Sequence, residues 1–311
     1  MPAVYVQSVL PSLQQWRAQG LKTALVTLIA TDGSAPRPLG SQMAIAENGK
    51  AVGNITGGCA EAAIVAEAQT RIAKHTNGSV RYGAGSPYMD IRLPCGSGID
   101  VYFDVEFDDA ALAQLLEAQR TRRPAALVID PENHQTKVLL GDTVPIADGY
   151  VRAYPPMARL VMAGKGPMVP ILAQLASAAD FEVIAFSPEP ETLEATTPHA
   201  VRAAHLSTSA AFRFAEFDRW TAFVSLFHEH EWEPSILSQA LHSECFYVGA
   251  LGSRRTHETR LVMLRELGLA EDLIARLHAP VGLKLGGRNP PEIALAILAE
   301  IVQTQYAQPR D

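Results

Sequence analysis

Cysteine is scarce in this chain of 311 residues, which contains only Cys59, Cys95 and Cys245. A small, odd number of cysteines cannot build a disulfide framework, and free thiols suit a reducing compartment. We therefore expect a cytoplasmic protein. Any special role of a cysteine must come from its thiol.

Long apolar runs and basic runs are also missing. The longest stretches without a charged residue, 1–16 and 166–179, fall short of the roughly 20 apolar residues that cross a bilayer. The 26 Lys and Arg against 33 Asp and Glu give a formal net charge of -7. These absences argue against a membrane protein and against a nucleic-acid-binding protein.

The chain length and the pattern of elements predict two domains. Residues 1–154 combine helices with strands, including a hairpin turn at Asn48-Gly49, in an α+β pattern whose pairings stay open. A Tyr-Pro-Pro sequence marks the boundary. In residues 155–311, strands alternate with helices, one of them expected at 210–217, which predicts a Rossmann-like, doubly wound parallel sheet. The fold class is therefore α/β.

A glycine turn, residues 164–166, follows the first strand of the second domain. Gly164, Lys165 and Gly166 lie where main-chain N–H groups and a helix N-terminus can bind a pyrophosphate. Pro167 and Pro170 lack N–H groups, so we expect the charge of Lys165 to compensate. Nucleotide binding and a purely structural turn both remain open here.

The acidic residue that usually binds a ribose diol is displaced in this sequence. The second strand ends in Ser187, and Glu189 follows two residues later. The order of strand, glycine turn and helix makes an NAD(P)-dependent oxidoreductase with a degenerate Rossmann site an alternative. The displaced acid counts against it, because the cofactor would lack its usual ribose anchor.

Further polar residues follow the later strands of this domain. His228 follows one strand, and Arg254 and Arg255 follow the next just before a helix, so all should face the ligand crevice of a parallel sheet. The two arginines suit an anion such as phosphate. Neighbouring histidines could instead bind a metal, but only their number suggests it, and we expect no metal site.

The first domain holds the candidate thiol. Gly57, Gly58 and Cys59 precede an alanine-rich helix, whose positive end favours a thiolate. Cys95 lies in another glycine-containing loop and could share a site with Cys59, whereas Cys245 is expected in the core. A buried, unreactive cysteine remains the alternative at each position.

Several of these segments together resemble the XdhC/CoxI family of accessory proteins. The resemblance rests on residues 33–40 (GSAPRPLG), 57–61 (GGCAE), 93–96 (LPCG), 247–257 (YVGALGSRRTH), 278–283 (HAPVGL) and 291–294 (PEIA). These motifs occur in the family order. Ser187 departs from the family, in which an Asp is usual at that position.

The resemblance implies a chaperone rather than a catalyst. Such proteins bind the molybdenum cofactor, as molybdopterin or its cytosine dinucleotide form, and support its sulfuration and insertion into a xanthine dehydrogenase or aldehyde oxidoreductase. The implied partners are this apo-molybdoenzyme and a cysteine desulfurase, and we also expect a homodimer. Cys59 would be the functional thiol with Arg37 beside it, while a scaffold that only docks partner proteins remains a third hypothesis.

Overall fold

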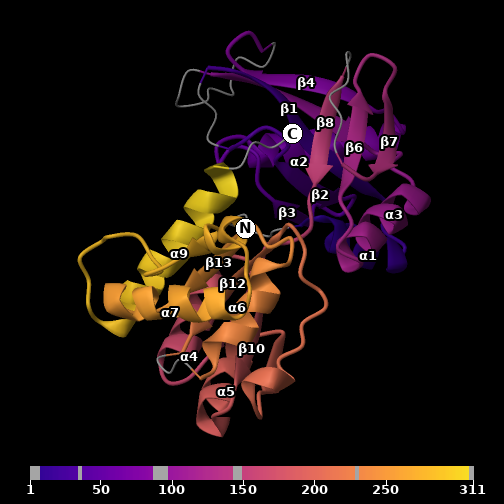
Figure 1. Ribbon diagram of the computed structural model, residues 1–311. Helices are drawn as coiled ribbons and strands as arrows, with labels where there is room; N and C mark the ends of the chain where they lie inside the picture. The colour runs from indigo at the N-terminus through magenta and orange to yellow at the C-terminus, as the bar shows by residue number, and fades with distance from the viewer. Residues whose placement is uncertain (1–7, 34–36, 87–96, 143–148, 228–230, 308–311) are drawn as a thin grey trace. The chain divides into compact units, whose positions relative to one another are not determined.

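The computed structural model in Figure 1 describes residues 8–33, 37–86, 97–142, 149–227 and 231–307. Contacts divide the chain into two units, Met1–Pro156 and Met157–Asp311. Within the described residues, no helix is both long enough and apolar enough to cross a membrane.

The first unit contains a five-stranded antiparallel sheet with the order β3-β2-β1-β5-β4. Its strands are β1 (Thr23–Asp32), β2 (Gln42–Ala46), β3 (Ala51–Gly53), β4 (Gly78–Gly83) and β5 (Gly98–Asp104). The hairpin predicted at Asn48-Gly49 is confirmed, because this turn joins the antiparallel strands β2 and β3.

A second antiparallel sheet has the order β7-β6-β8. It consists of β6 (Ala125–Asp130), β7 (Gln135–Leu140) and β8 (Tyr150–Tyr154), and the helices of this unit are α1 (Leu10–Ala18), α2 (Glu61–Lys74) and α3 (Asp109–Arg120). Alternate residues of β1 face two cores. Val26 packs with Ile64 of α2, whereas Leu25 packs with Leu13 of α1 and Leu115 of α3. The unit has the expected α+β organisation.

The second unit contains a six-stranded parallel sheet with the order β11-β10-β9-β12-β13-β14. Its strands are β9 (Arg159–Gly164), β10 (Glu182–Ser187), β11 (Arg202–His205), β12 (Thr221–Leu226), β13 (Tyr247–Ala250) and β14 (Leu277–His278). The chain runs outward from β9 through β10 to β11 and then returns to β12 on the other side of β9. The order therefore reverses between β9 and β12, as in a Rossmann-like fold.

Helices cover both faces of this parallel sheet. They are α4 (Met168–Ala178), α5 (Pro190–Thr196), α6 (Glu233–Leu241), α7 (Arg254–Glu266), α8 (Glu271–Ile274) and α9 (Pro290–Ala307). One core contains Leu172 of α4 and Ile297 of α9, and the other contains Ile236 of α6 and Leu264 of α7. The predicted doubly wound architecture is confirmed.

The helix predicted at residues 210–217 is wrong. A single 3₁₀ turn, Ser209–Ala211, is followed by irregular chain. Phe212 and Phe214 are both buried although they are only two residues apart. The ring centroid of Phe212 lies 5.0 Å from that of Phe186 and 5.9 Å from that of Phe223. Packing of these rings against the sheet overrides helix formation.

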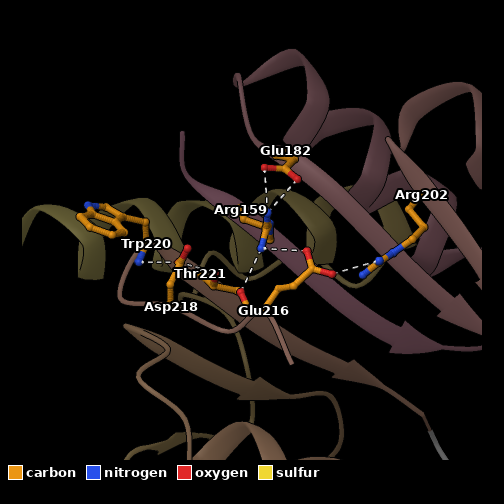
Figure 2. Close-up of polar contacts among 7 residues, drawn as sticks. All are labelled: Arg159, Glu182, Arg202, Glu216, Asp218, Trp220 and Thr221. Carbon is orange, nitrogen blue, oxygen red and sulfur yellow. Dashed lines mark hydrogen bonds and ion pairs between the residues drawn. The ribbon is translucent and has the colours of Figure 1, made fainter. Parts of the chain in front are cut away.

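Ion pairs hold the same segment at the amino ends of the strands, as Figure 2 shows. The buried guanidinium of Arg159 donates to the carbonyl oxygen of Glu216 and to the carboxylate of Glu182, both at 3.0 Å. The Glu216 carboxylate lies 3.3 Å from Arg202. Because ligands of parallel sheets bind at the carboxyl ends of strands, we assign this cluster to stability.

Candidate functional site

The strand register of the first unit brings several loop ends to one edge of its larger sheet. Asp32 at the end of β1 pairs with Gly98 at the start of β5. Gly53 at the end of β3 pairs with Met43 near the start of β2. The chain therefore enters residues 54–60, here called the cysteine loop, at the edge where residues 33–41 connect β1 to β2.

The cysteine loop presents the thiol to solvent. Gly57, Gly58 and Cys59 are exposed, whereas Thr56 and Ala60 on either side are buried. The backbone of Gly58 has a φ of +112°. Helix α2 begins only at Glu61. Cys59 therefore lies two residues before the first residue of the helix.

A single carboxylate organises the cysteine loop. Glu61 accepts hydrogen bonds from the N–H groups of Ile55, Thr56 and Gly58 at 3.2, 2.7 and 2.7 Å. Oε1 accepts the N–H groups of Ile55 and Thr56, whereas Oε2 accepts the N–H of Gly58 and, at 2.5 Å, the Thr56 hydroxyl. Partial burial acts to raise the pKa of Glu61, but the hydrogen bonds from Thr56 and Ile55 outweigh it and hold the pKa below its ordinary value.

Two further candidate residues belong to the first unit. Arg37 is half-buried in the connection from β1 to β2, which leaves the same sheet edge as the cysteine loop. Cys95 lies outside the described residues. The association of Arg37 with Cys59 stays a prediction.

In the second unit, the glycine turn lies at the carboxyl end of β9. Gly164 permits a close approach to β12, because a Cβ at this position would lie 2.5 Å from the Cβ of Leu226. Gly166 has a φ of +72°, and a Cβ there would meet no atom within 4 Å. The first glycine therefore serves strand packing, whereas the second faces open space.

Glu189 reaches the glycine turn, a contact that the sequence did not predict. Its carboxylate oxygen Oε2 accepts a hydrogen bond from the N–H of Gly166 at 2.8 Å and from the Thr192 hydroxyl at 2.7 Å. These hydrogen bonds, from Thr192 first and Gly166 second, lower the pKa of Glu189. The usual ribose position at the end of β10 holds Ser187 and not an acid. The carboxylate of Glu189, two residues later, nevertheless reaches the glycine turn.

The cationic residues of this unit have different surroundings. The Lys165 ammonium lies 5.4 Å from the ring centroid of Trp232. Arg254 and Arg255 are exposed and form the first two residues of α7 after the N-cap Ser253. His228 lies outside the described residues. Arg254 and Arg255 therefore place positive charge on the side of the sheet where β13 ends.

A buried ion pair supports the carboxyl ends of β12 and β13. Arg260 of α7 binds both carboxylate oxygens of Glu233 at 3.0 Å and donates to the carbonyl oxygen of Leu251 at 2.6 Å. Ser225 of β12 donates to Glu233 at 2.8 Å. Both charged residues are buried. The pair thus ties the start of α6 and the turn after β13 to the sheet.

The candidate residues fall into two groups. Arg37 and Cys59 belong to the first unit, whereas the glycine turn, Arg254 and Arg255 belong to the second. Among the residues whose placement is described, no group of three or more His, Cys, Asp or Glu side chains could hold a metal ion. The groups available for ligand binding are therefore the exposed thiol of Cys59, a carboxylate held by hydrogen bonds in each unit, and the exposed guanidinium groups of Arg254 and Arg255.

Comparison with known proteins gives the family. Residues 16–83 match the family model described as the XdhC and CoxI family, and residues 160–301 match the XdhC Rossmann domain. The molybdenum cofactor insertion chaperone PaoD of Escherichia coli is 32% identical over 294 residues, which cover 94% of this chain and 86% of that protein. A Bacillus subtilis protein named as a probable xanthine dehydrogenase subunit is 24% identical, with coverage of 91% and 93%.

A solved structure supports the fold over the whole length. The crystal structure described as a xanthine dehydrogenase from Bacillus halodurans superposes with a TM-score of 0.80 at 21% sequence identity, covering 98% of this chain and 97% of that one. The sequence resemblance stated from the motifs is confirmed by the family models and by the similarity to PaoD. This chain belongs to the XdhC and CoxI family.

Proposed function

We propose that this chain binds the molybdenum cofactor, supports its sulfuration and inserts it into an apo-enzyme of the xanthine dehydrogenase or aldehyde oxidoreductase type. The observation that carries the proposal is the exposed Cys59 on a loop that Glu61 fixes. The relative PaoD, named as a molybdenum cofactor insertion chaperone, supports the same function.

The thiol fits a molybdenum centre better than the other candidate groups do. Sulfur ligands suit soft metal centres, and a chaperone must release its cargo, which requires an accessible ligand. Cys59 is exposed, whereas Cys245 is buried. We therefore assign cofactor contact to Cys59 and a structural role to Cys245.

Positive side chains would hold the anionic part of the cofactor. The formal net charge of -7 repels an anion at long range, so attraction must be local. Arg37, Lys165, Arg254 and Arg255 supply such charge in the two units. By contrast, the N–H of Gly166 already binds a carboxylate and does not fit a phosphate.

The proposal includes partners. An apo-molybdoenzyme would receive the cofactor, and a cysteine desulfurase would supply sulfur for it in the cytoplasm. A homodimer would allow Cys59 of one chain to work with the glycine turn of the other. Cross-linking to the apo-enzyme, with and without cofactor, would test the first interaction.

Delivery of the cofactor tests the function. Protein loaded with molybdenum cofactor under anaerobic conditions is mixed with an apo-xanthine dehydrogenase, and the activity regained is measured. Cys59→Ala should lower activation roughly tenfold, which corresponds to about 1.4 kcal/mol of lost interaction. Cys245→Ala is the matched control and should deliver normally. Unchanged delivery by Cys59→Ala contradicts the assigned role of this thiol.

A further inference from the structure

We propose that Glu189 makes the glycine turn a site for the ribose hydroxyls of a nucleotide, and not for its phosphates. The inference rests on the proposed function only in that a dinucleotide form of the cofactor would bring such a ribose. It goes beyond that function because it assigns a ligand group and a specificity residue in the second unit.

The carboxylate of Glu189 is held in place from several sides. Oε2 binds the N–H of Gly166 and the hydroxyl of Thr192, and that hydroxyl itself lies 3.1 Å from the Gly166 nitrogen. The N–H of Glu189 donates to the Ser187 hydroxyl at 3.2 Å, so the main chain after β10 is also anchored. Ser187 stands at the position where an acid is usual, and its hydroxyl anchors the main chain of Glu189 two residues later.

One oxygen of this carboxylate is available to a ligand. Among the described residues, Oε1 of Glu189 has no hydrogen-bond partner, and the side chain is only half-buried. A Cβ at Gly166 would meet no atom within 4 Å, so the turn itself is open on the side where a side chain would project. An ionised carboxylate only accepts hydrogen bonds, and adjacent ribose hydroxyls are donors of matching geometry.

A phosphate would find few donors at the same place. Pro167 and Pro170 have no N–H, and the N–H of Val169 points back to the carbonyl oxygen of Gly166 at 3.4 Å. The N–H of Gly166 is occupied by Glu189. A phosphate would also lie against a negative carboxylate, which costs energy in a partly buried site. The phosphates must therefore contact groups other than the main-chain N–H of Gly166.

Nucleotide binding to the full-length protein tests this inference directly. ADP, CDP, GDP and UDP are titrated by calorimetry, followed by the 2′-deoxy form of each nucleotide that binds. We expect at least one ribonucleotide to bind and its 2′-deoxy form to bind roughly tenfold more weakly, since a hydrogen bond to a charged group is lost. Glu189→Ala should reduce this ratio to about one.

A neighbouring acid provides the matched control. Glu191, in the first turn of α5, is exposed, so Glu191→Ala should keep the preference for ribose. Thr192→Val is a second variant that loosens Glu189 without removing it, and it should give an intermediate ratio. Equal affinity for ribose and deoxyribose forms, or no binding of the four nucleotides at millimolar concentration, overturns the inference.

The result is separable from the proposed function. Molybdopterin without a nucleotide should still be retained by Glu189→Ala, because the inferred contact is to the ribose alone. If the wild-type protein binds molybdopterin normally but binds ribonucleotides and 2′-deoxynucleotides equally well, only the inference is overturned. Failure of the wild type to bind molybdopterin would overturn the proposed function, whatever the nucleotide result.

Discussion

The carboxylate of Glu61 accepts a hydrogen bond from the N–H of Gly58 at 2.7 Å, directly before the exposed Cys59. Main-chain N–H groups at the start of a helix normally attract anions from outside. Here the chain supplies the anion itself. The loop is thereby fixed around its own carboxylate, and the Cys59 thiol is left exposed on its surface.

Replacing Glu61 should destabilise the protein in a pH-dependent way. Glu61→Ala removes an ionised acceptor of several hydrogen bonds, and we expect a loss of about 1–3 kcal/mol at about pH 7. Because the pKa of Glu61 is lowered in the folded state, its contribution is present above the unfolded pKa and is lost as the pH falls through the folded pKa.

Urea unfolding at about pH 7 and about pH 3 measures this effect. The difference between wild type and Glu61→Ala should be largest at the higher pH and should shrink in acid. Glu67→Ala, in the same helix, is a control that leaves the loop intact. A difference that grows as the pH falls contradicts the role assigned to the ionised Glu61.

The described cysteines should differ sharply in reactivity. Cys59 is exposed, whereas burial raises the pKa of the Cys245 thiol to about 12. Because the thiolate is the nucleophile, only on the order of one Cys245 in ten thousand is reactive at about pH 8. Iodoacetamide should label Cys59 in the native protein and Cys245 only after unfolding, as peptide mass spectrometry will show. Native labelling of Cys245 ahead of Cys59 would be inconsistent with this structure.

Breaking the buried ion pair should be costly. Arg260 and Glu233 have side-chain exposures of 1% and 2%, whereas Arg265 and Glu271 in the control pair have 49% and 68%. We expect Arg260→Ala to lose about 3–5 kcal/mol of stability. Arg265→Ala should change the stability little, because its ion pair is exposed to solvent.

Chemical denaturation of both variants tests this contrast, and Arg260→Lys serves if Arg260→Ala does not fold. Arg260→Lys keeps the charge but loses the paired hydrogen bonds, so it should also be less stable than Arg265→Ala. Similar unfolding midpoints for the buried and exposed pairs would rule out the buried pair as a major support of the strand ends.

Gly53, at the entry of the cysteine loop, should not tolerate a side chain. Its φ is +87°, and a Cβ would lie 2.2 Å from the carbonyl oxygen of Gln42. Gly20 has a φ of +79° but no atom within 4 Å of a Cβ, so it isolates the effect of backbone strain. Gly20→Ala should cost about 1–2 kcal/mol and Gly53→Ala a further ~1–3 kcal/mol in thermal unfolding. Equal losses would show that the close approach to β2 is unimportant.

Local patterns predicted most of the elements, because periodicity and turn chemistry are local properties. The hairpin at Asn48-Gly49 and the alternation of strands and helices after residue 156 are confirmed. The short strands β8, β11 and β14 were missed, since their few residues carry no clear pattern. The helix predicted at 210–217 does not form, because Phe212 in this segment packs against Phe186 and Phe223, which are distant in the sequence.

The sites were harder to predict, because their key contacts join separate segments. Spacing placed Glu189 two residues beyond the ribose position, but the turn through Pro188 brings its carboxylate to Gly166. The pairing of Glu233 with Arg260 spans 27 residues and leaves no local signal. By contrast, Cys59 could be singled out because its glycines and the following helix are adjacent in sequence.

Retention of cofactor by the purified protein tests the central claim most directly. The full-length chain is incubated with molybdenum cofactor under anaerobic conditions and passed through a gel-filtration column, and molybdenum and protein are measured in each fraction. We predict that molybdenum elutes with wild-type protein in near-equal molar amounts and that Cys59→Ala retains much less. Molybdenum that elutes entirely apart from the wild-type protein would contradict the proposed function.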